Sequence, residues 1–321
     1  MAEQKRLALG IDLGGTSIKV GVVTHKGEIV GRGERATEVP RGAAGVIANM
    51  ALAARDAMAH AGVTAADLEG AGVGAPGICD VKAGAVVVAV NLSWHNVEAA
   101  AMLKEELGMP VYLDNDANCA ALGEQWCGAA SGSHHALMIT LGTGVGGGLV
   151  LDGKIYHGFR GWAGEFGHMP AVEEGGAPCN CGKHGCVETV ASATAMANFA
   201  RQEIEAGRAP YMAAKAAERG GKVDARLVIE SARQGDAPAQ AVLAKVGEHL
   251  GTCVAGLVTA LNPELIVIGG GGSHAGDFVL EPMRRVLKAK GMPGVADVCR
   301  IVPAELGNDA GIIGAASLVW R

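Results

Sequence analysis

The chain has 321 residues, which is enough for a sizeable hydrophobic core and most naturally for two domains. Hydrophobic residues make up 49% of it and charged residues 19%, a balance that excludes an intrinsically disordered chain. The formal net charge of −6 argues against a nucleic-acid-binding surface, which needs a basic patch.

The first residues do not predict a secretory signal. Met1 to Arg6 is polar, and the apolar run that follows is broken by Asp12, Gly14 and Gly15. No stretch reaches the roughly 18 uninterrupted apolar residues of a membrane span. We therefore expect a soluble cytoplasmic protein with no nucleic-acid or membrane partner.

The first part of the chain predicts alternating strands and helices. Strands are expected at residues 7–13, 18–23, 28–31, 70–73 and 110–113. Helices are expected at 43–61 and 97–107, each ended by a glycine, and a further helix begins at Ala117.

The opening pattern then returns. Residues 136–157 repeat the order of residues 7–30, namely strand, Gly/Thr loop, strand, turn and strand. The second copy has predicted strands at 135–141, 149–151 and 154–156, and its loop is 142–148. The repeat predicts two related β-rich lobes, whose loops would clamp a polyphosphate if they faced each other.

The rest of the chain is predicted to be mostly helical. Helices are expected at 191–206, 225–233, 238–261 and 310–320, and strands at 265–268 and 300–302. With a hinge near residues 116–123, we predict a smaller N-terminal lobe of residues 1–116 plus about 306–321. A larger lobe, residues 117–305, carries the cysteine cluster described below.

The first chemical motif is the run Asp12-Leu13-Gly14-Gly15-Thr16-Ser17-Ile18-Lys19. Its glycines let backbone N–H groups approach phosphate oxygens, its hydroxyls add donors, and an Asp at a strand end can orient a hydrated Mg²⁺. It is not a Walker loop, and a plain β-hairpin turn is the alternative. The repeat at Gly142, Thr143 and Gly144 favours phosphate binding.

The second motif is Asn115-Asp116-Ala117-Asn118, where a strand ends and a helix begins. A carboxylate there can accept the proton of a hydroxyl that attacks the γ-phosphate of ATP. Asp and Asn are also favoured helix N-caps, so an ordinary cap is the alternative interpretation.

The third motif predicts a metal site. His168, Cys179, Cys181 and Cys186 lie within 19 positions and suit a tetrahedral structural zinc ion. His184 is a rival ligand, although the short loop between two cysteines disfavours it, and a redox-active cysteine pair is a weaker alternative. Because four protein ligands close the site, we assign the zinc to folding.

The remaining cysteines lie among apolar residues and are predicted to be small core side chains: Cys79, Cys119, Cys127, Cys253 and Cys299. Two carboxylates, Glu165 and Glu188, flank the predicted zinc loop. Carboxylates are good acceptors for pairs of sugar hydroxyls, and solvated surface glutamates are the alternative.

With these motifs in order, the whole chain closely resembles the ROK family of sugar kinases and repressors. The run from Asp12 to Thr16 with Lys19 looks like its first phosphate loop, and Leu141 to Gly148 looks like the second. The segment from Gly164 to Met169, followed by Cys179 to Glu188, looks like its zinc signature, with no departure at the key positions.

The resemblance implies an α/β actin-like ATPase (ribonuclease H-like) fold with a cleft between two lobes. It implies Asp116 as the catalytic base, and His168 as both a zinc ligand and a substrate contact. The residues expected around the sugar are Gly74, Asn91, Asn115, Asp116, Glu165, His168 and Glu188. The residues expected near the adenosine are Gly269, Gly270 and Gly271.

The resemblance also favours a substrate. The stretch Asn91-Leu92-Ser93-Trp94 resembles the Asn-Leu-x-Trp segment of the family's glucokinases, so we predict phosphorylation of the 6-hydroxyl of glucose by ATP. N-acetylglucosamine, mannose, fructose or another hexose is the alternative substrate, and polyphosphate is an alternative donor. The family implies a homodimer or homotetramer.

Two other functions are weaker hypotheses. One is a sugar-responsive repressor of the family, which carries an N-terminal helix-turn-helix. The first predicted strand begins too early for that module, and the acidic net charge disfavours DNA binding. A non-catalytic sugar-binding protein would not need the phosphate loops or Asp116.

Overall fold

The computed structural model describes residues 6–321. Residues 1–5, which include most of the polar segment used above to argue against a secretory signal, lie outside the described residues. The chain forms two compact units. Unit 1 comprises the chain up to Met138, Gly148–Gly164 and Glu305–Arg321, and unit 2 comprises Ile139–Gly147 and Glu165–Ala304. The predicted lobe boundaries stay a prediction.

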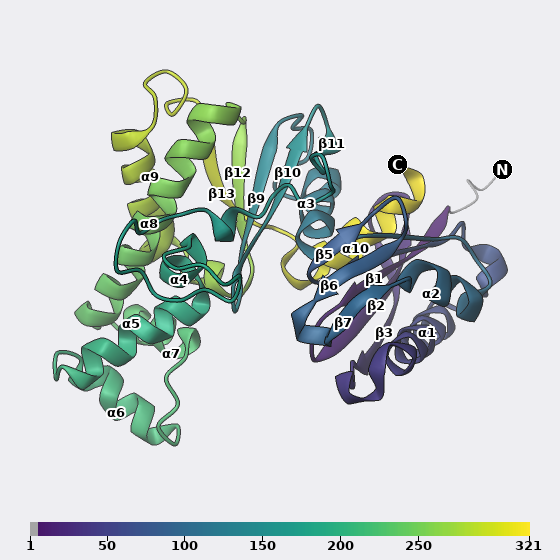
Figure 1. The fold of residues 1–321 in the computed structure, drawn as a ribbon, viewed down its shortest axis with the longest axis horizontal. Coiled ribbons are helices and arrows are strands. Elements are labelled where there is room, and N and C mark those ends of the chain that lie inside the picture. The colour runs from purple at the N-terminus through teal and green to yellow at the C-terminus, as the bar shows by residue number, and fades with distance from the viewer. Residues whose placement is uncertain (1–5) are drawn as a thin grey trace. The chain divides into compact units, whose positions relative to one another are not determined.

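Two five-stranded mixed sheets dominate the fold (Figure 1). The first has the order β3-β2-β1-β4-β8, formed by Ile29–Ala36, Ser17–Thr24, Leu7–Leu13, Ala71–Ala75 and Val111–Asn115. The second has the order β11-β10-β9-β12-β13, formed by Lys154–Ile155, Val145–Leu151, Ala136–Leu141, Leu265–Gly269 and Arg300–Pro303. If the strands of each sheet are numbered in chain order, both sheets have the spatial order third, second, first, fourth and fifth. This shared order confirms the duplicated unit and the predicted mixed α/β class.

The helices fill the intervals between these strands. Their bounds are α1 Gly42–Ala61, α2 Ala99–Leu107, α3 Asp116–Cys127, α4 Val187–Ala191, α5 Ala193–Glu205, α6 Pro210–Glu218, α7 Ala225–Arg233, α8 Ala237–Leu261, α9 Asp277–Lys290 and α10 Ala310–Ser317. A small sheet, β5-β6-β7, is formed by Ile78–Asp80, Ala85–Ala89 and Trp94–Val97.

Several predicted boundaries are wrong. The strand expected at 28–31 continues to Ala36, and the α-helix expected at 310–320 ends at Ser317. Val97 ends strand β7, so helix α2 begins at Ala99 rather than at 97. The second glycine loop is shorter than expected because Val145 to Gly148 lie in β10. The helix expected at 191–206 is divided at Ser192, whose extended backbone and side-chain acceptance from Ala195 N–H make it the N-cap of α5.

Glycines let helices approach both faces of the first sheet closely. A Cβ on Gly10 or Gly72 would lie 1.9 or 1.8 Å from a backbone oxygen of α10, and one on Gly33 would lie 2.1 Å from a backbone oxygen of α1. On α10 itself, a Cβ on Gly314 would lie 1.6 Å from the Cys119 oxygen of α3. Helix α10 is therefore packed backbone to backbone against β1, β4 and α3.

A buried carboxylate fixes the point where the chain re-enters unit 1. Glu124 on α3 is fully buried, and its carboxylate accepts hydrogen bonds from the N–H groups of Ala129, Glu305 and Leu306 at 2.8, 3.2 and 2.9 Å. These bonds satisfy a charge that would otherwise be costly to bury, and they direct the chain toward α10.

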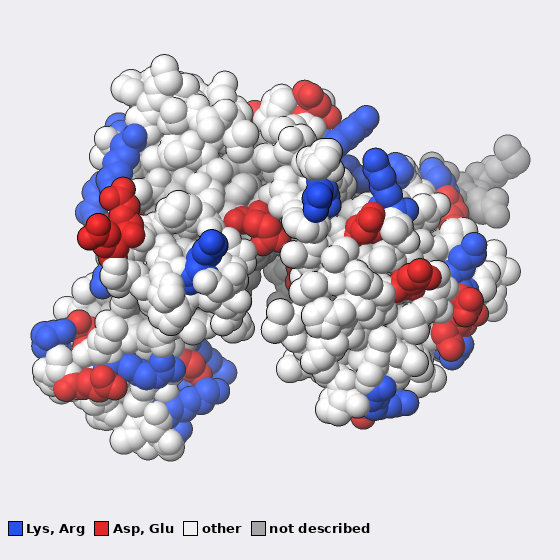
Figure 2. Space-filling model, viewed as in Figure 1, with Lys and Arg blue, Asp and Glu red and all other residues white. Residues whose placement is uncertain are grey.

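Of the described helices, α8 alone is long and apolar enough to cross a membrane. Its most apolar 18-residue window is 61% buried, and the helix packs against α9, α7, α5 and α4. We therefore interpret α8 as the core helix of unit 2. On the face shown in Figure 2, Lys and Arg side chains are interspersed with Asp and Glu rather than gathered into a basic stripe.

The backbone contact of α10 predicts a large effect of one methyl group. Gly72→Ala should lower the free energy of unfolding by about 3 kcal/mol, the upper end of the range for overpacked cores, because its Cβ meets the Ala315 carbonyl. Gly256→Ala is the matched control, since this exposed glycine inside α8 has open space around it and alanine is the better helix former. Urea unfolding of both variants checks this, and equal effects would contradict the packing argument.

Candidate functional site

The predicted site residues divide between the two units. Unit 1 holds Asp12, Gly14, Gly15, Thr16, Lys19, Gly74, Asn91, Asn115 and Asp116. Unit 2 holds Gly142, Thr143, Gly144, Glu165, His168, Cys179, Cys181, Cys186, Glu188, Gly269, Gly270 and Gly271.

Three parallel strands of unit 1 bring their carboxyl ends together. Asp12 on β1 is in register with Gly74 on β4, and the next residue of β4, Ala75, is in register with Asn115 on β8. A Cβ on Gly74 would lie 3.5 Å from the Asp116 Cα. The register therefore places Asp12, Gly74, Asn115 and Asp116 in one cluster at the end of the sheet where α/β folds bind ligands.

The first glycine loop is a tight turn between β1 and β2. Gly14 N–H donates to the Ser17 carbonyl at 3.0 Å, and the Thr37 hydroxyl donates to the Gly14 carbonyl at 2.7 Å. A Cβ on Gly15 would lie 3.5 Å from the Asn91 Cβ, so the structure brings this loop beside an exposed predicted sugar contact.

Lys19 faces Asp12 across the hairpin. Burial raises the pKa of the Asp12 carboxyl, and the Lys19 ammonium acts in the opposite direction. The two residues are register partners on β1 and β2. The hairpin therefore places an ammonium group opposite this partly buried carboxylate.

The turn between β8 and α3 carries Asp116. Asn115 is the N-cap of α3, and its side-chain oxygen accepts from the Ala117 and Asn118 N–H groups at 2.9 and 3.3 Å. Its amide nitrogen donates to the Gly77 carbonyl at 3.0 Å. Asp116 is thus the first helical residue, where its Oδ1 accepts from Ala117 N–H and the helix dipole favours the ionised carboxylate.

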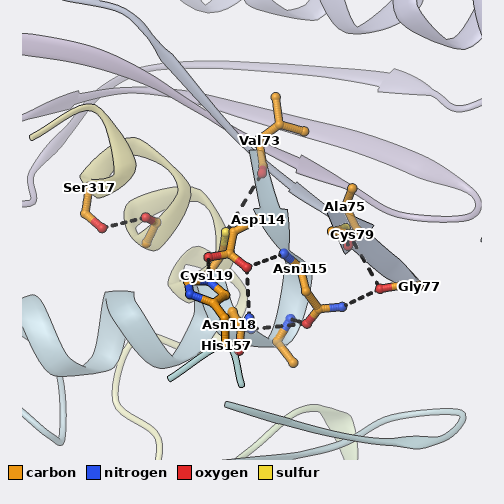
Figure 3. A network of polar contacts seen from close by, with 12 residues as sticks. Val73, Ala75, Gly77, Cys79, Asp114, Asn115, Asn118, Cys119, His157 and Ser317 are labelled. Carbon is orange, nitrogen blue, oxygen red and sulfur yellow. Dashed lines mark hydrogen bonds and ion pairs between the residues drawn. The ribbon is translucent and has the colours of Figure 1, made fainter. Parts of the chain in front are cut away.

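The residue before this turn, Asp114, is at the centre of a polar network (Figure 3). Its side chain is 2% exposed. Oδ1 accepts from Asn115 N–H at 2.7 Å and from the Asn118 amide at 2.8 Å, and His157 Nε2 lies 2.7 Å from Oδ2. The hydrogen bond to Asp114 raises the pKa of His157, so the imidazolium form is favoured.

The second glycine loop lies in unit 2 and is held by hydrogen bonds within the loop and from adjacent residues. Gly142 N–H donates to the Gly144 carbonyl at 3.0 Å, and the Thr194 hydroxyl donates to the Thr143 carbonyl at 2.7 Å. Glu188 Oε2 accepts from Val145 N–H at 3.0 Å, and a Cβ on Gly144 would lie 2.0 Å from that oxygen. The loop and the predicted sugar-binding Glu188 are therefore in direct contact.

The predicted zinc ligands gather in unit 2. One donor atom from each of His168, Cys179, Cys181 and Cys186 lies within 4.8 Å of the others. His168 Nδ1 is 3.5 Å from Cys179 Sγ, and the Cys181 and Cys186 sulfurs are 3.6 Å apart. A tetrahedral zinc ion needs its nitrogen and sulfur ligands about 3.5–3.8 Å apart, so this donor set and spacing fit a zinc site.

The imidazole of His168 presents its second nitrogen to a carboxylate. His168 Nε2 lies 3.8 Å from Glu165 Oε2. Burial raises the pKa of Glu165, His168 lowers it, and the Glu188 carboxylate raises it further. Glu165, His168 and Glu188 therefore form one electrostatically coupled group beside the cysteines.

The predicted adenosine glycines follow β12. Gly270 has a φ of 79°, and a Cβ on it would lie 2.7 Å from the Leu141 carbonyl oxygen. Both its backbone conformation and its close approach to β9 require glycine. Gly271 has open space within 4 Å and begins a short 3-10 helix, Gly271–Ala275.

Asp114 and His157 are not among the site residues predicted from the sequence. They are 43 positions apart, and no local motif joins them. One signal was available in the sequence: Asp114 directly follows the apolar strand predicted at 110–113 and precedes Asn115. A carboxylate buried at such a position requires a partner for its charge.

Comparison with known proteins identifies the family. The model described as the ROK family matches residues 8–321. The chain belongs to the ROK family. It is 45% identical over 314 residues to a glucokinase of Halalkalibacterium halodurans, covering 98% of this chain and 95% of that protein. It is 39% identical to a glucokinase of Thermotoga maritima, covering 97% of this chain and 96% of that protein.

A solved ROK structure has the same fold. The ROK family glucokinase from Streptomyces griseus, in complex with glucose and AMPPNP, has a TM-score of 0.83 and 34% sequence identity. The match covers 97% of this chain and 98% of that chain. The predicted actin-like fold of the family is therefore confirmed.

The His157–Asp114 pair predicts a pH-dependent stability. Because the folded-state pKa of His157 is raised, its contribution is full below about pH 6.5, the unfolded-state value, and is lost as pH rises through the folded-state pKa. His157→Gln should therefore destabilise this ROK protein more at pH 6 than at pH 9, which urea unfolding measures.

A second histidine–aspartate pair of unit 1 supplies the control. His135 Nε2 lies 3.5 Å from Asp152 Oδ1, and both side chains are well exposed. His135→Gln should have a small effect at both pH values because exposed ion pairs contribute little. An equal cost of His157→Gln at pH 6 and pH 9 would contradict a charged His157–Asp114 pair.

Proposed function

We infer that this protein is an ATP-dependent glucokinase that phosphorylates the 6-hydroxyl of glucose. The observation that carries the inference is the 45% identity to a glucokinase over 98% of the chain. The similarity to a solved glucokinase that holds glucose and an ATP analogue supports both substrates. We place the enzyme in the cytoplasm as a homodimer or homotetramer, as for the family.

Asp116 is the proposed general base. Its carboxylate accepts the proton of the sugar hydroxyl as that oxygen attacks the γ-phosphate of ATP, a role typically worth about 10²–10⁴ in rate. Its position at the first turn of α3, capped by Asn115, supports the role because a helix N-terminus keeps a carboxylate ionised. The side-chain cap of α3 comes from Asn115 rather than from Asp116.

The sugar would be held by hydrogen bonds from several side chains. Carboxylates of Glu165 and Glu188 accept from pairs of hydroxyls, and the amides of Asn91 and Asn115 both donate and accept. His168 offers Nε2, since its Nδ1 is turned toward Cys179. Gly74 would contribute through its backbone, and the space beside its Cα is taken by the Cys119 side chain.

The phosphates of ATP would be held by main-chain donors. The glycine loops at Gly14 to Thr16 and Gly142 to Gly144 offer N–H groups and threonine hydroxyls, and Lys19 adds a positive charge. Asp12 would hold the hydrated Mg²⁺ that accompanies ATP, which when bound neutralises charge on the phosphate oxygens. The glycines from Gly269 to Gly271 leave room for the adenosine.

A structural zinc ion is proposed for the cluster of His168, Cys179, Cys181 and Cys186. Donation from the Lys183 N–H lowers the pKa of the Cys181 thiol, whereas burial raises the pKa of the Cys179 and Cys186 thiols. Cys181 is therefore the cysteine of the cluster most readily converted to the thiolate that zinc requires. When bound, the ion cross-links the loop that carries Glu165 and Glu188. It supplies folding stability rather than catalysis, because four protein ligands complete its tetrahedron.

Glucose specificity can be tested with a panel of hexoses. We expect kcat/KM for ADP release from MgATP to be at least about tenfold higher with glucose than with mannose, fructose, N-acetylglucosamine or N-acetylmannosamine, because misplaced hydroxyls leave buried polar groups unpaired. A higher value for another hexose would show that the segment from Asn91 to Trp94 was given too much weight. Faster turnover with polyphosphate than with ATP would show that polyphosphate, rather than ATP, is the preferred phosphoryl donor.

Zinc content can be tested by metal analysis. The purified protein should contain one zinc ion per chain, and Cys181→Ser should lose it together with several degrees of thermal stability. Cys127→Ser is the control, since this cysteine lies in unit 1 outside the cluster. Unchanged zinc content in Cys181→Ser would remove this residue from the ligand set.

A further inference from the structure

The carboxylate of Asp114 has three hydrogen-bonding partners from separate parts of unit 1. Asn115 N–H comes from the end of β8, the Asn118 amide comes from α3, and the His157 ring comes from the segment after β11. Each partner lies within 2.8 Å of a carboxylate oxygen. Asp114 thus joins β8, α3 and the segment after β11 (Figure 3).

Three carboxylates of unit 1 act on one buried thiol beside this network, Cys119. Burial is the main cause that raises the pKa of the Cys119 thiol, and the carboxylates of Asp114, Asp116 and Asp12 raise it further, with a smaller effect from Cys79. These groups come from β8, α3, β1 and β5, so several acidic groups converge on one buried thiol. A like charge nearby raises the pKa of a carboxylate and makes it less able to stay ionised as a base.

His157 is the cation that faces Asp114. Its ring is about one-third exposed, on the side where it lines a hollow of about 370 Å³ together with Asp80, Lys82 and Arg160. Its backbone carbonyl accepts from Ala163 N–H at 3.1 Å, which holds the loop that carries the ring. A charged hydrogen bond of this length to a buried carboxylate is among the stronger polar contacts of a protein.

We propose that His157 is a positioning residue of the kinase reaction. By binding Asp114 it fixes the turn between β8 and α3, and its positive charge compensates Asp114 so that Asp116 stays ionised and accepts the hydroxyl proton. The proposal rests on the proposed function, in which Asp116 is the base. His157 acts through Asp114 and is not assigned a contact with either substrate.

His157 makes two proposed contributions, the hydrogen bond that fixes the turn and the positive charge that compensates Asp114. Substitutions can separate them. His157→Gln retains a donor but removes the charge, so a bare carboxylate is left beside Asp116. Asp114→Asn removes the negative charge, and His157 then loses the cause of its raised pKa. In the double variant, Asp114→Asn with His157→Gln, the pair is neutral again as it is in the wild type.

The test is the pH dependence of kcat at saturating glucose and MgATP. In His157→Gln we expect kcat to fall by about 10- to 100-fold, the range found when the partner behind a functional side chain is removed at metal sites. The KM for glucose should change less than kcat. The acid limb of the kcat–pH profile, where kcat falls as the base becomes protonated, should move to higher pH by at least about half a pH unit. The reason is that an uncompensated negative charge on Asp114 raises the pKa of Asp116.

The double variant gives the decisive comparison. Its acid limb should return to the wild-type position even where kcat stays low, since the net charge of the pair is restored. A purely structural role of His157 would lower kcat without moving the acid limb in either variant. That result would overturn the electrostatic part of the proposal, and an unchanged kcat in His157→Gln would overturn all of it.

Controls keep these outcomes distinct. His135→Gln removes an exposed histidine–aspartate pair of the same unit and should leave kcat and its pH profile unchanged. His157→Asn repeats the test with a shorter amide if His157→Gln does not fold, as judged by thermal unfolding. If the wild-type enzyme phosphorylates no hexose, the proposed function fails and this inference falls with it, a failure seen without any variant.

Discussion

The backbone contact of helix α10 with β1, β4 and α3 is the constraint on which the site of unit 1 depends. Glycines at positions 10, 72 and 314 bring main-chain atoms so close that a single methyl group at any of them would overlap a carbonyl oxygen. This contact holds strands β1 and β4, which carry Asp12 and Gly74 near their carboxyl ends, close to the helix that begins at Asp116. Glycines of β1, β4 and α10 thus help to determine where the acidic side chains at this end of the sheet lie.

The same compact arrangement creates an electrostatic problem. Asp12, Asp114 and Asp116 all raise the pKa of one buried thiol, Cys119, so their negative charges are concentrated in a small region. Lys19 compensates Asp12, and His157 compensates Asp114. Asp116 is left at the N-terminus of α3, where the helix dipole stabilises its charge. The general base that we propose at Asp116 needs this balance, because it must be ionised and still accept a proton.

Local patterns were predictable from the sequence, and contacts between distant segments were not. The strand 7–13, the helix 225–233 and the four-residue His/Cys cluster follow from periodicity or spacing within short segments, and the structure contains all three. Strands β5 to β7 were not predicted because strands of three to five residues give little periodic signal. Helix α9 was also not predicted, and it contains Pro282 in its interior. His157 and Asp114 meet only because the fold brings them together across 43 positions. The roles of the predicted site residues stay predictions.

The most direct test of the account is the pair of quantities kcat and glucose Kd for Asp116→Asn. Asparagine keeps an oxygen that can accept from Ala117 N–H at the start of α3, so the turn should remain intact. We predict that kcat falls by about 10²–10⁴ while glucose Kd, from isothermal titration, changes only a few-fold. A kcat within about threefold of the wild-type value would contradict the assignment of Asp116 as the base, since general-base catalysis is worth far more than that.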